Sequence, residues 1–222
     1  MATTVEVRRC TRLRSEPMRG RTVLERDSMS TTRNTRKEAM HYLSHYESPL
    51  GAMTMASDGE HLTGLWFDGQ KYDRSTIDGN AELKPHLPVF TQTAQWLDAY
   101  FEGSDPGFTP PISVEGSDFK KMVSSIMLSI PFGATSTYAR IAAEVARRTG
   151  RTHMSAQAVG GAVGRNPIVL IVPCHRVLAS DGSLRGYAGR VDRKEWLLER
   201  EGVTMSGLST PPDADDGGER RE

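Results

Sequence analysis

The sequence predicts a mixed α/β protein of the α+β kind. It consists of a small antiparallel sheet with one helix, then a mainly helical domain with a winged helix-turn-helix-like unit. Three observations support this. Short apolar stretches separated by turn sequences fill residues 40–67; apolar residues recur at helical spacing from residue 90 onward; and net charge is −9 over 40–118 but +7 over 119–208. The charge contrast indicates two domains with different partners, the basic one suited to a polyanion, although two solvated surfaces that attract each other would explain it too.

Composition excludes several classes of protein. The 222 residues carry 28 basic and 28 acidic side chains, so a simple polycation that coats nucleic acid is excluded. The longest uninterrupted apolar run, residues 168–172, is far shorter than the roughly 20 residues of a membrane-spanning helix. The only cysteines are Cys10 and Cys174, which excludes a disulfide framework and a zinc site built mainly on cysteine. Free cysteines fit a reducing compartment, and we expect a cytoplasmic protein, associated with the nucleoid in a bacterium or located in the nucleus in a eukaryote.

The chain ends differ in composition from the middle. The first 39 residues are rich in Arg, Ser and Thr, show no apolar period, and lack the apolar core of a secretory signal. The division we expect is a disordered leader, an N-terminal α/β domain, a helical C-terminal domain and a disordered tail, at residues 1–39, 40–111, 112–208 and 209–222.

The first domain reads as a sheet followed by a helix. We expect three strands, near residues 41–47, 52–56 and 62–67. Turn sequences at 48–51 and 57–59 separate them, and the polar stretch 68–88 reads as a loop. Apolar residues at helical spacing predict a helix over residues 90–102.

The second domain begins with a helix that Ser117 and Asp118 can cap and that Pro131 stops. A second helix is expected from Tyr138 to about Thr149, with Gly150 ending it.

A third helix is expected from near Ser155. Two helices joined by a short turn, beside Arg147 and Arg148, favour a helix-turn-helix, with a plain helical hairpin as the alternative. Residues 158–164 of the third helix are all small, and its two adjacent glycines cost about 1 kcal/mol each. Close approach of another backbone, from a neighbouring helix or a nucleic-acid groove, is the compensation we expect.

Cys174 is the candidate nucleophile. It follows the apolar run 168–172, which predicts a buried strand or extended segment. His175 and Arg176 come directly after it, and a neighbouring imidazole and cation can favour the thiolate. Taken alone, this pattern is also that of an inert core cysteine.

The stretch PCHRV at 173–177 resembles the active-site motif of the O6-alkylguanine-DNA alkyltransferases, also called methylated-DNA–protein-cysteine methyltransferases. The resemblance covers roughly residues 40–205, with further blocks in the family's order. These blocks lie at 48–51, 131–138, 160–161, 166–167, 186–189, 194–198 and 201–202.

The resemblance implies direct DNA repair. Double-stranded DNA would be bound through the C-terminal domain, and O6-alkylguanine, or O4-alkylthymine, would be flipped out of the duplex. Cys174 would accept the alkyl group irreversibly, in a single-turnover reaction that needs no cofactor or metal. His175 would take the thiol proton and Glu201 would hold its tautomer. Tyr138 would donate to the base, and Asn166 would support the turn. We expect a monomer that contacts no membrane.

The resemblance also implies a set of DNA- and base-binding residues: Ser155, Gln157, Arg147, Arg148, Arg176, Val177, Tyr187 and Ala188. Among them, Val177 and Ala188 would read the base edge through backbone groups. Gln157 stands where the family usually has the arginine that fills the gap left by the flipped base. Arg190 replaces a family glycine, and Ser124 a common aromatic residue. Some members bind zinc in the first domain, but no cysteine lies between 40 and 118, so we expect no zinc.

Three alternatives stay open. The first is a non-enzymatic lesion sensor on the same scaffold; members of that type lack the cysteine, whereas Cys174 is present here. A Cys–His hydrolase would turn over through an acyl-enzyme. A transcription factor would use the helix-turn-helix as a dimer on a palindromic site.

Overall fold

The computed structural model of the chain describes residues 40–210. The predicted leader over 1–39, and the predicted tail from residue 211 onward, lie outside the described residues. Ser209, where the predicted tail begins, still pairs with Ser183. Within 40–210, no helix is long and apolar enough to cross a membrane.

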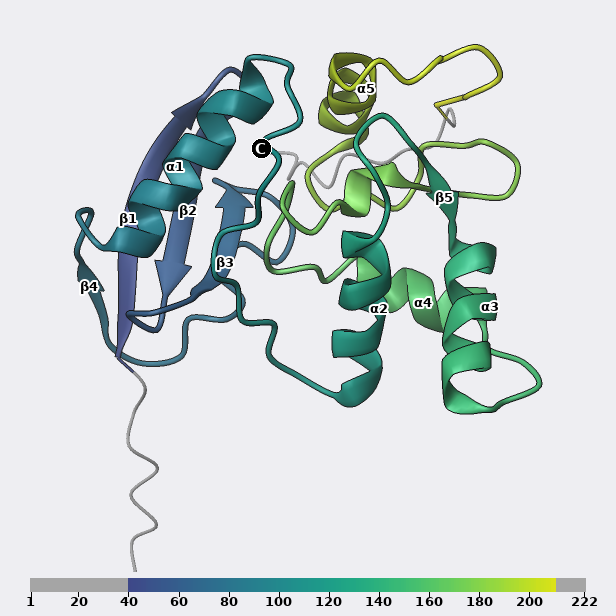
Figure 1. Cartoon of the computed structure of the whole chain (residues 1–222), viewed down its shortest axis with the longest axis horizontal. Helices are drawn as coiled ribbons and strands as arrows, with labels where there is room; N and C mark the ends of the chain where they lie inside the picture. The colour runs from purple at the N-terminus through teal and green to yellow at the C-terminus, as the bar shows by residue number, and fades with distance from the viewer. Residues whose placement is uncertain (1–39, 211–222) are drawn as a thin grey trace, which may run out of the picture. The chain divides into compact units, whose positions relative to one another are not determined.

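The first half of the described chain forms a four-stranded sheet in the order β3-β2-β1-β4 (Figure 1). Strands β1 (His41–Ser48), β2 (Gly51–Ser57) and β3 (Leu62–Phe67) are antiparallel neighbours, as the turn sequences predicted. The loop predicted over 68–88 is wrong at one place, because β4 (Ala81–Leu83) pairs parallel to β1. Its three residues are all exposed, so it carries no apolar alternation by which the sequence could reveal it.

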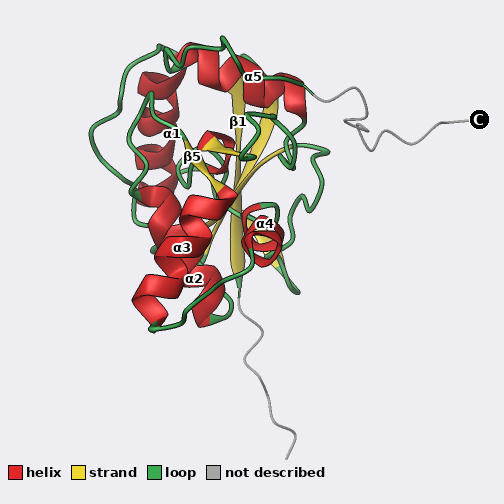
Figure 2. Ribbon diagram, turned by 90° about the vertical axis from the view of Figure 1, so that its right-hand side faces the viewer, coloured by secondary structure: helices red, strands yellow, loops and turns green. Residues whose placement is uncertain are grey.

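Helix α1 (Pro88–Phe101) packs against the three antiparallel strands (Figures 1 and 2). Pro88 occupies its first turn, where a missing N–H costs no hydrogen bond. The face turned to the sheet buries a row of apolar and aromatic side chains, and Tyr100 in its last turn is fully buried.

The second half is mainly helical, which confirms the mixed architecture expected from the sequence. Its elements are α2 (Asp118–Leu128), β5 (Ser136–Thr137), α3 (Tyr138–Thr149), α4 (Ala156–Val163), the 3-10 turn η1 (Cys174–Arg176), β6 (Val177–Leu178) and α5 (Val191–Arg200). Side-chain caps fix three helix starts: Ser117, Thr137 and Ser155 each accept a hydrogen bond from a backbone N–H of the first turn. Helix α2 ends at Leu128, before Pro131, and Ile130 is buried beyond it.

The apolar run 168–172 is buried, as predicted, but it forms turns and not a strand. Leu170 has a positive φ of 68°, and the Val172 N–H donates back to the Ile168 carbonyl at 3.1 Å. The segment is anchored to the edge of β3, because Leu65 exchanges backbone hydrogen bonds with Pro167 and Val169. The segment that leads into Cys174 is thereby tied to the sheet.

Arg190 adopts a backbone conformation that suits glycine. Its φ of 78° and ψ of 148° lie in a region that only glycine enters at low cost, and a side chain there costs about 1–3 kcal/mol. Arg190 therefore strains the loop that leads into α5.

We expect Arg190→Gly to stabilise the protein by about 1 kcal/mol, which raises its melting temperature by roughly 2–4 °C in calorimetry. Arg190→Ala is the matched control, because it removes the guanidinium but keeps the strained Cβ. Equal stability of the two variants would contradict the strain.

Candidate active site

Cys174 opens the turn η1 and is almost fully buried. Asn166 holds it: the Asn166 Nδ2 group lies 3.1 Å from Sγ and donates to the Val172 carbonyl at 2.7 Å, while its Oδ1 accepts from the Ile168 N–H at 3.1 Å. One amide side chain thus fixes the whole turn around the sulfur. Asn166 was expected to support this turn, and the structure places its side chain there.

The electrostatic state of the thiol differs from expectation. Burial raises the pKa of Cys174, and the Asn166 hydrogen bond and the Lys194 ammonium offset this only in part. The resting sulfur is therefore a protonated thiol, not the ionised acceptor that its neighbours in the sequence suggested, and it needs a proton acceptor before it can attack.

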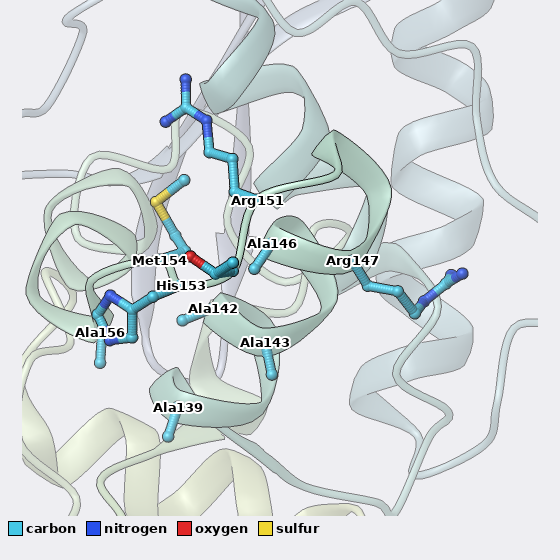
Figure 3. Close-up of a pocket in the computed structure, with 10 residues that line it drawn as sticks. Ala139, Ala142, Ala143, Ala146, Arg147, Arg151, His153, Met154 and Ala156 are labelled. Carbon is cyan, nitrogen blue, oxygen red and sulfur yellow. The ribbon is translucent and has the colours of Figure 1, made fainter.

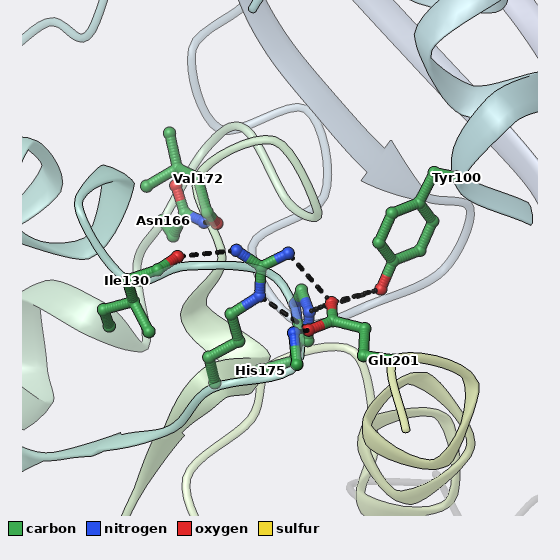
Figure 4. Close-up of polar contacts among 8 residues, drawn as sticks. Tyr100, Ile130, Asn166, Val172, His175 and Glu201 are labelled. Carbon is green, nitrogen blue, oxygen red and sulfur yellow. Dashed lines mark hydrogen bonds and ion pairs between the residues drawn. The ribbon is translucent and has the colours of Figure 1, made fainter. Parts of the chain in front are cut away.

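His175, the predicted base, is completely buried beside Glu201 (Figure 4). Its Nε2 lies 2.6 Å from Glu201 Oε1, while Nδ1 is buried with no hydrogen-bond partner among the described residues. Burial lowers the pKa of His175 and outweighs the attraction of Glu201, so the ring is neutral at pH 7. The predicted pairing of His175 with Glu201 across 26 positions is present.

The position of Arg176 differs from the prediction. It was predicted to bind DNA, but it is buried, and its guanidinium donates to both oxygens of Glu201, through Nε at 2.8 Å and Nη2 at 3.0 Å, and to the Ile130 carbonyl at 2.7 Å. Burial alone would raise the pKa of Glu201, but the hydrogen bonds from His175 and Arg176 lower it to about 2. Arg176 therefore keeps the carboxylate ionised and does not face solvent.

Tyr138 begins α3, and its hydroxyl donates to the Arg185 carbonyl at 3.3 Å. Burial raises its pKa to about 12, so it stays a proton donor. A Cβ at Gly186 would lie 2.6 Å from this hydroxyl, so the glycine lets the loop close against the tyrosine. Tyr187 is buried with its ring edge-on to His175, and its hydroxyl finds no partner within 40–210.

The two backbone positions expected to read a base have partners in the structure. The Val177 carbonyl accepts from Lys194 Nζ at 2.7 Å, and the Ala188 carbonyl accepts from the Lys71 N–H at 3.3 Å. Each keeps a second lone pair for a ligand.

Helices α3 and α4, the pair for which a helix-turn-helix was predicted, pack against each other and are joined by residues 150–155. Between α3 and the turn lies a hollow of about 440 Å³ (Figure 3). It is lined by Ala139, Ala142, Ala143, Ala146, Arg147, Arg151, Thr152, His153, Met154 and Ala156. Ser155 and Gln157 are exposed beside it at the start of α4. Arg147 and Arg148 are also exposed, but both pair with Glu144 at 2.7 Å.

The glycines of α4 are not explained by protein packing. A Cβ at Gly160 would come no closer than 3.9 Å to the Tyr138 ring, and one at Gly161 no closer than 3.8 Å to Arg165, both ordinary contacts. The neighbouring-helix explanation is therefore wrong for the described residues, and the exposed side of α4 is open to close approach from outside.

Comparison with known proteins agrees with this geometry. Residues 41–114 match the ribonuclease-like domain of 6-O-methylguanine DNA methyltransferase, and residues 118–203 match its DNA binding domain. The chain belongs to this family. It is 38% identical over 160 residues to the methylated-DNA–protein-cysteine methyltransferase of Mycobacterium tuberculosis, covering 71% of this chain and 92% of that relative. The corresponding protein of Haemophilus influenzae is 33% identical over 163 residues, covering 73% of this chain and 87% of the relative.

Solved structures of the family are similar as well. The crystal structure of Mycobacterium tuberculosis OGT in complex with DNA superposes with a TM-score of 0.61 at 36% identity, covering 73% of this chain and 92% of that chain. These matches confirm the family and the enzyme class that the motif blocks indicated.

Sequence reasoning missed two residues of this methyltransferase-family site. Lys194 on α5 is fully buried, and burial lowers its pKa to about 8. It precedes the buried Leu197 and Leu198 by three and four residues, so a cation on the apolar face of a predicted helix was the available signal. Tyr100 gave no signal, because an aromatic residue in an apolar helical stripe looks like core.

We expect Asn166→Ala to raise the pKa of Cys174, because it removes a hydrogen bond that favours the thiolate. Asn166→Asp should raise it further, since a carboxylate beside the sulfur repels the thiolate. The pH dependence of iodoacetamide labelling, read by mass on the Cys174 peptide, measures both. The exposed Asn80→Ala is the control, and unchanged labelling profiles in the Asn166 variants would contradict this role.

Proposed function

We propose that the protein repairs alkylated DNA directly, by moving the alkyl group of O6-alkylguanine in a duplex onto Cys174. The observation that carries this is the arrangement of three buried groups: a thiol held by Asn166, a neutral imidazole beside it in the chain, and an ionised Glu201 on the imidazole. The family supplies the reaction class.

The reaction first requires that the Cys174 thiol lose its proton. Because Glu201 takes the hydrogen bond of Nε2, the free Nδ1 of His175 is the atom that accepts the proton, directly or through a water. The sulfur then forms a bond to the alkyl carbon while the bond from that carbon to O6 breaks and its electron pair stays on the oxygen. Tyr138, protonated at neutral pH, donates to the base as this charge develops.

The product is a thioether that no group of the site can cleave, so each molecule acts once. Turnover distinguishes this from a Cys–His hydrolase, which would regenerate its thiol. A lesion sensor without chemistry is disfavoured, because the Asn166 contact and the His175–Glu201 pair serve no purpose around an unreactive group.

DNA is proposed to lie against the helix-turn-helix. The small residues on the exposed side of α4 allow this helix to lie close against a DNA groove. Arg147, Arg148 and Arg151 supply positive charge beside it. A thiol cannot reach O6 inside a stacked duplex, so the base must be flipped out, and Gln157, exposed in the first turn of α4, is placed to fill its gap. Monomeric action, the cytoplasmic location and the domain division at residues 111/112 remain predictions.

Incubation with a duplex oligonucleotide that contains O6-methylguanine tests the transfer. We expect the intact mass to rise by one methylene, located on the Cys174 peptide, with one mole of protein consumed per mole of lesion. Cys174→Ala should gain nothing, whereas Cys10→Ala should react like the parent protein. Repair without a mass change, or repeated turnover, would overturn the proposal.

Arg147 and Arg148 test the DNA face. Alanine at both positions should weaken binding to all duplexes alike and reduce the slope of log K against log salt by about one per lost phosphate contact, as fluorescence anisotropy can measure.

A substitution at Glu144 should have the opposite effect on DNA binding at the same face. Its carboxylate neutralises both arginines, so Glu144→Gln should strengthen binding and steepen the salt dependence. Lys84→Ala removes a cation directly after β4 and should change neither quantity. If the Glu144 and arginine variants bind like the parent protein, the DNA does not contact this face.

A further inference from the structure

Tyr100 places a hydroxyl from the first half of the chain inside the candidate active site. It lies in the last turn of α1, within the segment that matches the ribonuclease-like domain, and it is fully buried. Its ring stacks on Trp96 at 5.1 Å and meets Phe132 edge-on at 6.0 Å, so its orientation is fixed. The hydroxyl lies 2.8 Å from Glu201 Oε1 and 3.3 Å from His175 Nε2 (Figure 4).

The protons of these three groups can be assigned from their chemistry. Ionised Glu201 only accepts hydrogen bonds, so the Tyr100 hydroxyl donates to it and leaves its oxygen as an acceptor. The Nε2 atom of His175 then faces two acceptors, Glu201 Oε1 and the Tyr100 oxygen, and must itself carry a proton. The neutral ring is left with its lone pair on Nδ1, which is the form that can accept the thiol proton.

We propose that Tyr100 is a positioning residue for alkyl transfer: its hydroxyl orients Glu201 and holds His175 in the tautomer that carries its proton on Nε2. This rests on the proposed function. It also implies that residues 118–203 do not form a complete acceptor site alone, because one group that sets the state of the base comes from α1.

The pH dependence of transfer reports this role. The titratable and charged groups around the His175 ring are Tyr100 from α1, Tyr187 from the loop before α5, Lys194 and Glu201 from α5 and its end, and the adjacent Cys174 and Arg176. Without the Tyr100 hydroxyl, Glu201 Oε1 loses one donor and more of its charge acts on His175, which raises the pKa of the imidazole. Because the neutral ring is the base, the rate must then begin to fall at a higher pH as the solution is acidified.

The test compares single-turnover transfer to Cys174 in the parent protein, Tyr100→Phe and Tyr46→Phe across a range of pH. Tyr46 is the matched control, because its hydroxyl donates to Asp98 on the same helix at 2.8 Å but lies outside the site. We expect Tyr100→Phe to react roughly tenfold more slowly, a part of the hundredfold or more that a placed general base contributes. Its acid limb should move to higher pH while its DNA affinity stays unchanged. Tyr46→Phe should match the parent in all three.

Nitrogen-15 chemical shifts of His175 in the parent protein add a readout that needs neither a variant nor activity. We expect the proton on Nε2. A proton on Nδ1, or a Tyr100→Phe rate and pH profile equal to those of Tyr46→Phe, would overturn the inference. Absence of transfer in the parent protein would instead refute the proposed function, and the nitrogen shifts would still decide the tautomer.

Discussion

A single buried carboxylate holds the candidate site together. Glu201 accepts five hydrogen bonds, from Tyr100, the Gly133 N–H, His175 and two nitrogens of Arg176. An isolated buried charge costs several kcal/mol, and it is tolerated only when a counter-charge and donors satisfy it. Arg176 is the counter-charge, and the other donors come from α1, from the loop after α2 and from η1. Elements far apart in the sequence must therefore meet at this carboxylate for the fold to be stable.

The counter-charge on Glu201 also affects the protonation state of the groups beside it. With Arg176 neutralising Glu201, the neighbouring imidazole can stay neutral and serve as a base, and burial favours that state further. The thiol is also kept uncharged by its burial, so the resting site holds a protonated sulfur next to an unprotonated ring. We expect such a thiol to react slowly with small oxidants or electrophiles, because the thiolate is the reactive species. A protein that can react only once benefits from that restraint.

The surface proposed to bind DNA is explained by the small residues of α4 and by the charges beside them. Protein contacts do not account for the glycines of α4, because a Cβ at Gly160 or Gly161 would make only ordinary contacts, whereas the cost of two glycines in a helix is intrinsic to the backbone. A helix that must fit closely against another molecule explains them. Glu144 moderates the charge of the same face, since its half-buried carboxylate pairs with both Arg147 and Arg148.

The sequence determined the local structure and indicated the candidate reacting groups. Strand alternation, turn sequences and helix caps depend on neighbours within a few positions, so β1, β2 and β3 and the starts of α2, α3 and α4 could be predicted closely. The motif around Cys174 indicated a candidate nucleophile beside His175, and the family resemblance added Glu201 as the acid on that imidazole. The exposed strand β4 and the turns of 168–172 could not be predicted, because their shape comes from pairing with distant strands.

Tertiary structure alone decided the environment of those groups. Arg176 reads as a cation for DNA, but burial beside Glu201 makes it an internal counter-charge. Lys194 and Tyr100 enter the site only because α5 and α1 converge on η1, and the pKa of Cys174 is set by how completely that convergence excludes water. Solvent exclusion and long-range hydrogen bonding depend on the whole packed chain, which is why no local pattern contains them.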